Sequence, residues 1–509
     1  MTARPHPRTP VIVGVGQILQ RTDDPSIAAD ATLLICEAVR AAAVDSAAAS
    51  DPIAAADVLA VVSTLTWRYG DAARVVTDRL GIHPRRVMTP MGGNSPQSLV
   101  NAASSRILSG DLDMAILTGG EAWRSRMRAR RDGIELTWPK ADPELLAVEP
   151  PEVWGHDLEM SSEAETEIGL IMPIQVYPMF ESAIRAARAV DGVGPEEHLR
   201  QVGAMWARFS EVASRNPFAW RQDALTASDI ISPGPGNRMV GLPYTKAMNS
   251  NNDVDMAAAV IICSVERAEA LGIPADRWVF PHAGTDCHEH PFISHRDVFH
   301  RTPAIEIGGA MALELADTDI DAVAHLDLYS CFPSAVQLGA TSLGIDPYNE
   351  TRSLTQTGGL SFAGGPWNEY VMHAIATMVH TLRNDAGSTG LVWANGGFVT
   401  KHAFGVYSTT PPATDFRHAE PQARIDALPS TVLATADDAA NDTHCTIEAY
   451  TVMHGRDGSP ETAWSAIRLA DGRRAWGRTD EAETLSHLVH GEHVGEQVRM
   501  LPDHRFEPV

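Results

Sequence analysis

Basic residues, cysteines and long apolar runs are all scarce in this chain. Its 40 lysine and arginine residues stand against 65 aspartate and glutamate residues, which gives a formal net charge of -25. Nucleic-acid binding needs a basic surface that neutralises phosphates, so this balance argues against a nucleic-acid partner. The few cysteines form no C-x-x-C pair, which argues against a zinc ribbon or a disulfide framework and predicts reduced thiols. They are Cys36, Cys263, Cys287, Cys331 and Cys445.

The absence of long apolar runs predicts a chain without a membrane span, because such a span needs ~20 apolar residues. The run 11–15 is too short for a signal-peptide core. The C-terminal Phe-Glu-Pro-Val matches neither an endoplasmic-reticulum nor a peroxisomal address. These absences predict a cytoplasmic protein. Its 509 residues, 44% of them hydrophobic, suffice for two or three domains with sizeable cores.

The stretch 91–121 combines a glycine turn, a helix and a buried strand. Gly92-Gly93 permits a tight turn, and residues 94–95 can cap a helix that accepts proline in its first turn. Apolar residues then recur at helical spacing up to Gly110. The run 114–118 is typical of a buried parallel strand. This arrangement is suited to holding a reactive group at a helix N-terminus.

Strands and helices alternate along much of the chain, which favours a mostly parallel sheet covered on both faces. We expect strands at 10–16, 58–62, 114–118, 257–263, 321–328 and 390–393, and helices at 27–43, 72–80, 195–214 and 369–382. The second half repeats the first, with glycine turns at Gly358-Gly359 and Gly396-Gly397. Such a repeat predicts two similar sheets stacked against one layer of helices.

Two segments depart from this alternation. Residues 122–245 have a less regular pattern and are predicted to be an inserted loop domain. Its five arginines at 124–131 leave two interpretations open, a solvated loop or a site for the phosphates of a nucleotide-bearing ligand. A proline-containing stretch, 411–428, is predicted to be a linker. Short β-rich runs and turns then predict a small antiparallel, OB-like β-barrel over 429–509.

Five segments resemble motifs of the thiolase family, in the same order. The stretch 91–121 resembles the nucleophile segment, and the sequence Asn-Pro-Phe-Ala-Trp-Arg at 216–221 resembles the sterol-carrier-protein branch. The resemblance implies an α/β thiolase fold of two repeated halves in five layers, with core halves 1–121 and 246–410. With its extra C-terminal barrel, the chain resembles the type-1 thiolase-like proteins.

The resemblance locates three catalytic positions that lack the family's catalytic residues. Gly93 stands where the nucleophilic cysteine is expected. Gly365, in the segment 357–366, stands at the essential histidine. Ala394 stands at the acid/base cysteine. A glycine cannot form an acyl-enzyme, so neither thiolysis nor Claisen condensation is expected.

Other motif positions suggest a remaining site. The resemblance places Tyr329 at the family's oxyanion-binding position, and Tyr329 and His402 are the catalytic candidates. A tyrosine base needs a cationic neighbour, and Lys401 or His402 could supply it, because we expect both in a loop that follows the strand end bordering the same pocket. In a competing alignment, 395–402 is itself the Asn-Gly-Gly…His segment, but it is one residue short and leaves no helix and strand before the linker. The implied substrate-binding residues are Asn249, Asn251, Cys331, Gly358, Gly359, Gly396 and Gly397.

Three function classes follow from the resemblance. The first is a protein that binds or acts on acyl-CoA thioesters in fatty-acid or sterol metabolism. The second is a retro-aldol carbon–carbon lyase or an acyltransferase that uses Tyr329 and His402. The third is a scaffold that recruits a protein partner through its barrel. A CoA thioester would be ligand or substrate, and no cofactor is expected. No metal site is expected either, because the histidine-rich loop 282–300 lacks metal-ligand spacing.

Overall fold

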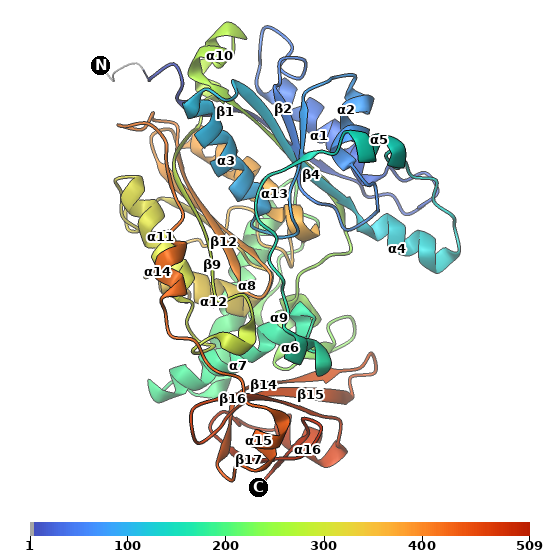
Figure 1. Ribbon diagram of the computed structural model, residues 1–509, viewed down its shortest axis with the longest axis vertical. Helices are drawn as coiled ribbons and strands as arrows, with labels where there is room; N and C mark the ends of the chain where they lie inside the picture. The colour runs from blue at the N-terminus through green and yellow to red at the C-terminus, as the bar shows by residue number, and fades with distance from the viewer. Residues whose placement is uncertain (1–4) are drawn as a thin grey trace.

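The computed structural model describes residues 5–509, and two β-sheets dominate its larger part (Figure 1). The first sheet has the order β1-β8-β4-β2-β3-β5 and the second the order β10-β11-β12-β9-β13. The first comprises β1 (Pro10–Leu19), β2 (Val58–Val61), β3 (Arg85–Met88), β4 (Met114–Ala122), β5 (Glu152–Val153) and β8 (Asp255–Ser264). The second comprises β9 (Phe280–His288), β10 (His325–Leu328), β11 (Thr389–Gly396), β12 (Lys401–Ser408) and β13 (Arg417–Ala419).

Two helices fill the space between the sheets. Both α3 (Ser95–Ser109) and α13 (Tyr370–Asn384) contact strands of each sheet. Further helices cover the outer faces, α1 (Ala31–Asp45), α2 (Ala72–Leu80) and α10 (Val265–Ala270) on the first sheet, and α11 (Pro303–Leu315) and α12 (Pro333–Ser342) on the second. The result is the five-layered stack that the resemblance to thiolases implied.

The central helix α3 begins and ends where the sequence predicted. Pro96 lies in its first turn, and Gly110 ends it with φ 83°, a left-handed conformation that glycine adopts without strain. The apolar residues Leu99 and Ile107 are buried, as are polar residues such as Gln97 on other faces. A helix with sheets on two sides is buried nearly all round, so its composition is less amphipathic than that of a surface helix.

Both sheets are mixed. The first sheet has three parallel and two antiparallel strand pairs, and the second has two of each, so the predicted parallel pairing holds only for part of each sheet. β8 pairs antiparallel with both β1 and β4, and β12 pairs antiparallel with both β11 and β9. The turn 397–400 between β11 and β12 is too short for the crossover that parallel strands require. β8 is nonetheless buried along its whole length, because helices cover both faces of the sheet.

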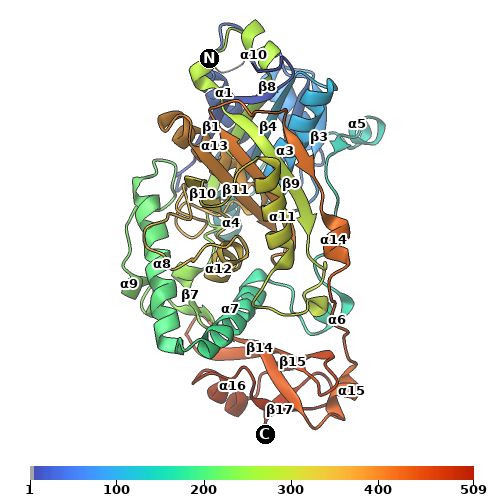
Figure 2. The same ribbon diagram turned by 90° about the vertical axis from the view of Figure 1, so that its left-hand side faces the viewer.

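The inserted segment and the C-terminal region form the rest of the molecule. The inserted segment holds α4 (Trp123–Asp132), α5 (Pro143–Val148), α6 (Glu163–Glu167), α7 (Pro173–Val190), α8 (Pro195–Arg215), α9 (Ala227–Ile231), β6 (Met239–Gly241) and β7 (Tyr244–Thr245). The C-terminal region holds α14 (Gln422–Asp426), α15 (Ala436–Ala440), β14 (Cys445–His454), β15 (Pro460–Arg468), β16 (Arg474–Thr479), α16 (Ala482–Leu488), β17 (Gln497–Met500) and β18 (Phe506–Pro508). Helix α7 packs against both α12 and β14, so it lies between the core and the C-terminal sheet (Figure 2).

The C-terminal region is built on an antiparallel sheet with the order β16-β15-β14-β17-β18, so the antiparallel β domain is confirmed and its OB-like barrel form stays a prediction. The backbone N–H of Arg478 on β16 donates to the carbonyl of His504 at 2.7 Å, which draws the two outer strands together. The segment expected to be a linker contributes β13, which pairs with β9 of the second core sheet. All five cysteines are buried free thiols. Among residues 5–509, no helix has the length and apolar character needed to cross a membrane.

Candidate functional site

The N-terminus of α3 meets the ends of β10 and β11 at Gly93. A Cβ placed on Gly93 would lie 2.6 Å from the hydroxyl oxygen of Tyr329 and would also collide with the carbonyl oxygen of Asn395. Tyr329 follows β10 directly, and its backbone N–H donates to the carbonyl of Trp393 on β11 at 3.1 Å. The phenol of Tyr329 therefore fills the space that a side chain at position 93 would need.

Tyr329 is buried and stays protonated at neutral pH. Burial raises its pKa well above the usual value, and the neighbouring Cys331 raises it further. Its ring packs edge-on against Tyr370, with centroids 5.7 Å apart. Burial likewise raises the pKa of Cys331 to about 12. Tyr329 is thus a hydrogen-bond donor rather than a base, and Cys331 is an unreactive thiol at neutral pH.

Lys401 brings a buried amine to the same place. Its Nζ donates a hydrogen bond to the carbonyl of Met91 and would lie 2.9 Å from a Cβ on Gly92. Lys401 is 5% exposed, and burial lowers its pKa. The positive end of the α3 helix dipole points at this position as well. Amine and helix end together favour a ligand oxygen that carries negative charge.

His402 does not share this site. Successive side chains on a strand point to opposite faces. Lys401 lies on the face of β12 towards α3, as does Tyr407, whose hydroxyl donates to Gln97 of α3 at 2.7 Å. His402 lies on the other face, where its Nδ1 accepts from Trp393 Nε1 at 3.4 Å. Burial lowers the pKa of His402 well below its usual value.

Two expectations about His402 are therefore corrected. Residues 401 and 402 lie in β12 rather than in a loop beyond the strand end, and His402 faces away from the Tyr329 hydroxyl. The competing alignment of 395–402 is not supported either, since β12 follows directly and no helix separates it from β13. The helix–strand pair α13 and β11 instead follows the segment 357–366, as the preferred alignment requires.

The other two positions at which the resemblance expects catalytic residues lie in packed surroundings. A Cβ on Gly365 would collide with the Ser250 hydroxyl and would lie 3.0 Å from Oδ1 of Asn252. The backbone N–H of Gly365 donates to the carbonyl of Asn251 at 2.9 Å. Ala394 is fully buried in β11, opposite Ala403 of β12. Ser250 therefore occupies the space at position 365, just as Tyr329 occupies it at position 93.

The glycine turns bring segments into close packing. Gly358 has φ 98°, and a Cβ there would collide with Ala213 of α8. Gly359 has φ 79°. A Cβ on Gly396 would lie 2.7 Å from Oδ1 of Asn94, and Gly397 has φ 71°. Close approach and left-handed backbone explain these glycines.

The two asparagines predicted to bind substrate differ in their partners. Asn249 donates through Nδ2 to the carbonyl of Thr245 at 2.7 Å, while its buried Oδ1 has no hydrogen-bond partner among residues 5–509. Asn251 instead accepts through Oδ1 from the backbone N–H of Asp253 at 3.3 Å. Only Asn249 retains a buried acceptor for a further donor.

A buried acid next to the site was missed by the sequence analysis. Glu369 belongs to a short 3-10 helix, η4 (Trp367–Glu369), at the start of α13, and its Oε1 lies 2.9 Å from Nε2 of His373. Nδ1 of His373 lies 2.7 Å from Oε1 of Gln17. Burial raises the pKa of Glu369 well above its usual value, and burial lowers that of His373 to about 3. A protonated Glu369 thus donates to a neutral His373. The sequence did carry one signal for Glu369: it is an acid that follows Gly365, the position of the family's histidine, by four residues.

The arginine-rich stretch is the helix α4 rather than a loop. Arg124 and Arg128 both form ion pairs with Asp23, at 3.0 and 2.6 Å, and Arg131 pairs with its neighbour Asp132 at 2.7 Å. The carboxylates of Asp23 and Asp132 therefore offset two of the five positive charges of this stretch and engage three of its arginines.

The histidine-rich segment 282–300 consists of most of β9 and the loop that follows it, and several of its histidines bond to main chain. Ring nitrogens of His282, His288 and His290 lie 2.8, 2.8 and 3.2 Å from the carbonyl oxygens of Thr410, Glu289 and Pro429. In the part of the chain that the structure describes, this segment brings no three potential metal ligands together.

A separate groove of about 1030 Å³ lies between the segment 233–246 and the turn joining β14 to β15. Arg238, Lys246 and Arg456 give it a basic lining, and among residues 5–509 Asp457 is the one acidic residue that lines it. None of the residues predicted to form the site lines this groove.

Comparisons with known proteins agree with this architecture. Residues 422–505 match a family model described as the thiolase-like protein type 1 additional C-terminal domain. The chain is similar to the crystal structure of a monomeric SCP2-thiolase-like protein type 1 from Mycobacterium smegmatis. The two share 30% identity with a TM-score of 0.81, over 99% of this chain and 100% of that one. No curated protein sequence gives a significant match.

Two more distant structures share the fold alone. One is titled an Ltp2-ChsH2(DUF35) aldolase, with 19% identity, a TM-score of 0.58, and coverage of 79% of this chain and 98% of that one. The other is the dimeric peroxisomal thiolase of Saccharomyces cerevisiae, with 14% identity, a TM-score of 0.54, and coverage of 80% and 98%. The protein therefore has a thiolase fold with an additional C-terminal domain. It belongs to the SCP2-thiolase-like proteins of type 1.

Proposed function

We propose that this protein binds thioesters of the acyl-CoA class, in fatty-acid or sterol metabolism, without forming an acyl-enzyme. The observation that carries this proposal is the Tyr329 hydroxyl in the space next to Gly93. Thiolysis and condensation in this superfamily need a nucleophile at that position, and here the position holds no side chain and has no room for one. The site is left with donors that recognise an oxygen.

Three features support recognition of a thioester carbonyl or a carboxylate at the N-terminus of α3. The protonated hydroxyl of Tyr329 and the amine of Lys401 both lie beside the glycines that precede the helix. The helix end adds the partial positive charge of its N–H groups. Donors fixed in a buried place stabilise an oxygen more than they would in water.

The proposal is tested by calorimetric titration with a panel of acyl-CoAs, with free CoA and the matching fatty acids for comparison. We expect saturable binding of at least one acyl-CoA and no change in the intact mass of the protein. Lys401→Met should weaken binding several-fold, while the exposed Lys140→Met should not. A loss of affinity in Arg238→Ala instead would move the site to the basic groove. If no acyl-CoA binds at millimolar concentration, the proposal is wrong, and only the scaffold function remains, in which the C-terminal domain recruits a protein partner.

A second candidate function is a carbon–carbon lyase that acts by retro-aldol cleavage. The buried amine of Lys401 favours it, because an amine whose pKa is lowered can attack a ketone carbon of the acyl chain and, with loss of water, form a Schiff base. The Schiff base takes up the electron pair of the cleaved carbon–carbon bond while the β-hydroxyl group becomes a carbonyl and gives its proton to water. Tyr329 would then supply the proton donor that His402, on the opposite face of β12, cannot supply. Borohydride trapping with a keto-acyl thioester should modify the Lys401 peptide in the wild type and leave Lys401→Met unmodified. An unmodified wild type contradicts this candidate.

A further inference from the structure

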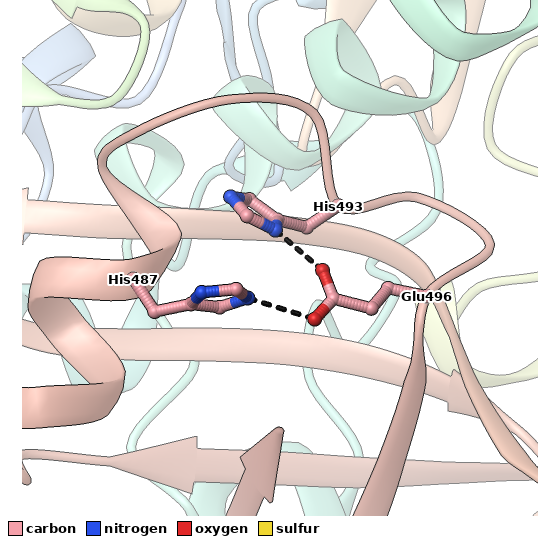
Figure 3. Close-up of side chains that lie close together, drawn as sticks. All are labelled: His487, His493 and Glu496. Atoms are coloured by element: carbon pink, nitrogen blue, oxygen red, sulfur yellow. Dashed lines mark hydrogen bonds and ion pairs between the residues drawn. The ribbon is translucent and has the colours of Figure 1, made fainter. Parts of the chain in front are cut away.

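Two histidines and a glutamate of the C-terminal sheet domain converge away from the thiolase-like site (Figure 3). His487 lies in the last turn of α16, and His493 and Glu496 lie in the loop 489–496 that leads to β17. Oε1 of Glu496 is 2.7 Å from Nε2 of His487, and its Oε2 is 2.5 Å from Nδ1 of His493. The three potential ligand atoms all lie within 4.8 Å of one another.

The hydrogen bonding of His493 orients its lone pair. Nε2 of His493 lies 3.0 Å from the carbonyl oxygen of His490, so this nitrogen must carry the proton and donate. In the neutral ring, Nδ1 of His493 then carries a lone pair that points at Oε2 of Glu496. Both atoms are hydrogen-bond acceptors, and they face each other. Such a pair needs a proton or a cation between its members. A backbone carbonyl that holds the second nitrogen is also the usual partner of a metal-bound histidine.

Accessibility and ligand chemistry restrict the ion. The side chain of His493 is 5% exposed, whereas that of His487 is 41% exposed and leaves an approach from solvent. Two imidazoles and one carboxylate suit zinc and related transition metals rather than magnesium or calcium, and they leave a position for water. In a tetrahedral site with metal–ligand bonds of ~2.1 Å, neighbouring ligand atoms are ~3.4 Å apart. The contacts of Glu496 with His487 and with His493 are shorter than this, so both must lengthen when the ion binds. His487, at an exposed helix end, is placed to allow this.

We propose that His487, His493 and Glu496 bind one zinc-class divalent ion, which fastens the loop 489–496 to α16. The same loop carries Glu492, which forms an ion pair with Arg185 of α7. The ion therefore stabilises the part of the C-terminal domain that contacts the inserted segment. This proposal does not depend on the ligand of the thiolase-like site.

The test uses the full-length, tag-free protein after metal removal, with Zn²⁺ titrated against a chromophoric chelator. We expect one saturable equivalent, a melting temperature that rises with Zn²⁺, and visible absorption bands of low-symmetry coordination with Co²⁺. Glu496→Gln and His487→Ala should each weaken Zn²⁺ binding at least tenfold and abolish the thermal effect. His444→Ala, an exposed histidine of the same domain, is the matched control and should behave as the wild type.

Two results would overturn the proposal. One is a wild-type protein that takes up no stoichiometric Zn²⁺, in which case the cluster is only a proton-linked His–Glu–His arrangement. The other is equal Zn²⁺ affinity in wild type, Glu496→Gln and His487→Ala, which places any bound ion elsewhere. Circular dichroism of each variant shows whether it is folded, and the surface position of His487 makes His487→Ala the variant least prone to misfold.

Discussion

The hydroxyl oxygen of Tyr329 lies 2.6 Å from the point where a Cβ on Gly93 would stand. The two residues are more than two hundred positions apart in the sequence, yet each fits only because of the other. A bulky phenol at 329 needs a glycine at 93, and a glycine at 93 leaves a gap that the phenol fills. A cysteine placed at position 93 alone would therefore collide with the Tyr329 hydroxyl.

This relationship predicts an energetic coupling between positions 93 and 329. Gly93→Ala should destabilise the protein by about 1–3 kcal/mol, because the added methyl group overpacks the site. In the Tyr329→Phe background, which lacks the hydroxyl, the same substitution should be less destabilising by at least about 0.5 kcal/mol. The Asn395 carbonyl remains in both backgrounds and should preserve part of the effect. Denaturant unfolding of the four proteins gives the coupling energy.

Gly234→Ala serves as the control, since a Cβ there meets no atom within 4 Å and should change stability by less than about 0.5 kcal/mol. Additive effects of Gly93→Ala and Tyr329→Phe would show that the hydroxyl does not occupy the space next to Gly93.

The layers of the fold could be predicted from sequence because their signals are local. A glycine turn, a helix of fixed spacing and a buried apolar strand recur in both halves, and α3 and α2 have the predicted bounds. Strand direction is not a local property. The antiparallel position of β8 between β1 and β4 depends on pairing between distant segments, so the alternation of strands and helices suggested more parallel pairing than exists.

The site was harder to predict because it depends on which way a side chain points. Lys401 and His402 are adjacent and both ionisable, but on a strand only one of them can face α3. Placing them in a loop hid this constraint. The role of Glu369 could not be predicted for another reason. Glu369 is bonded to His373 and its pKa is raised by the charge of Glu121, and these two residues come from different layers of the fold.

His402 should affect stability in acid without affecting the ligand site. Burial holds the pKa of His402 well below that of an unfolded histidine. As pH falls below ~6.5, His402 therefore binds a proton in the unfolded state but not in the folded state, and the folded state becomes relatively less stable. His402→Met removes this penalty, and its stability relative to wild type should rise by up to about 1.4 kcal/mol per pH unit on acidification. The lost bond to Trp393 adds an offset that does not vary with pH.

Chemical denaturation between about pH 5 and pH 8 measures this difference, and calorimetry at neutral pH measures ligand binding. Acyl-CoA affinity in His402→Met should equal that of the wild type. A folded variant that no longer binds would contradict the placement of His402 on the opposite face of β12 from Lys401.

Glu369 should give a pH dependence of the opposite sign. Its folded-state pKa is raised by burial and then by the charge of Glu121, so its contribution to stability is fully present below the unfolded pKa of ~4.3. That contribution is lost as pH rises towards the raised pKa, by up to about 1.4 kcal/mol per unit. Glu369→Gln keeps a donor for His373 and cannot ionise.

We therefore expect Glu369→Gln to match the wild type at about pH 4 and to exceed its stability by a growing margin towards pH 8. Glu121, whose pKa burial raises to about 7, is present in both proteins and titrates in both. Parallel stability curves for the two proteins would mean that Glu369 is ionised in the folded state.

The ion pair between Arg185 and Glu492 should control how firmly the C-terminal domain is attached. Arg185 of α7 is buried, binds Glu492 through Nε and Nη2, and also donates to the hydroxyl of Tyr450 at 3.0 Å. Arg185→Met removes the cationic partner of Glu492 and leaves the Tyr450 hydroxyl with only its bond to the Gly491 carbonyl, so it should destabilise the protein by roughly 2–4 kcal/mol. Adding Glu492→Gln should recover part of the loss, because no uncompensated charge remains there.

The measurement is unfolding by denaturant, combined with limited proteolysis that follows release of the C-terminal domain. Arg200→Met is the matched control, since Arg200 pairs with Glu197 on the exposed face of α8 and should contribute less than about 1 kcal/mol. A buried pair that joins two segments differs from an exposed pair within one helix because its loss also separates the surfaces it joins. Equal effects of Arg185→Met and Arg200→Met would show that attachment of the domain rests on the β6–β14 pairing and apolar packing alone.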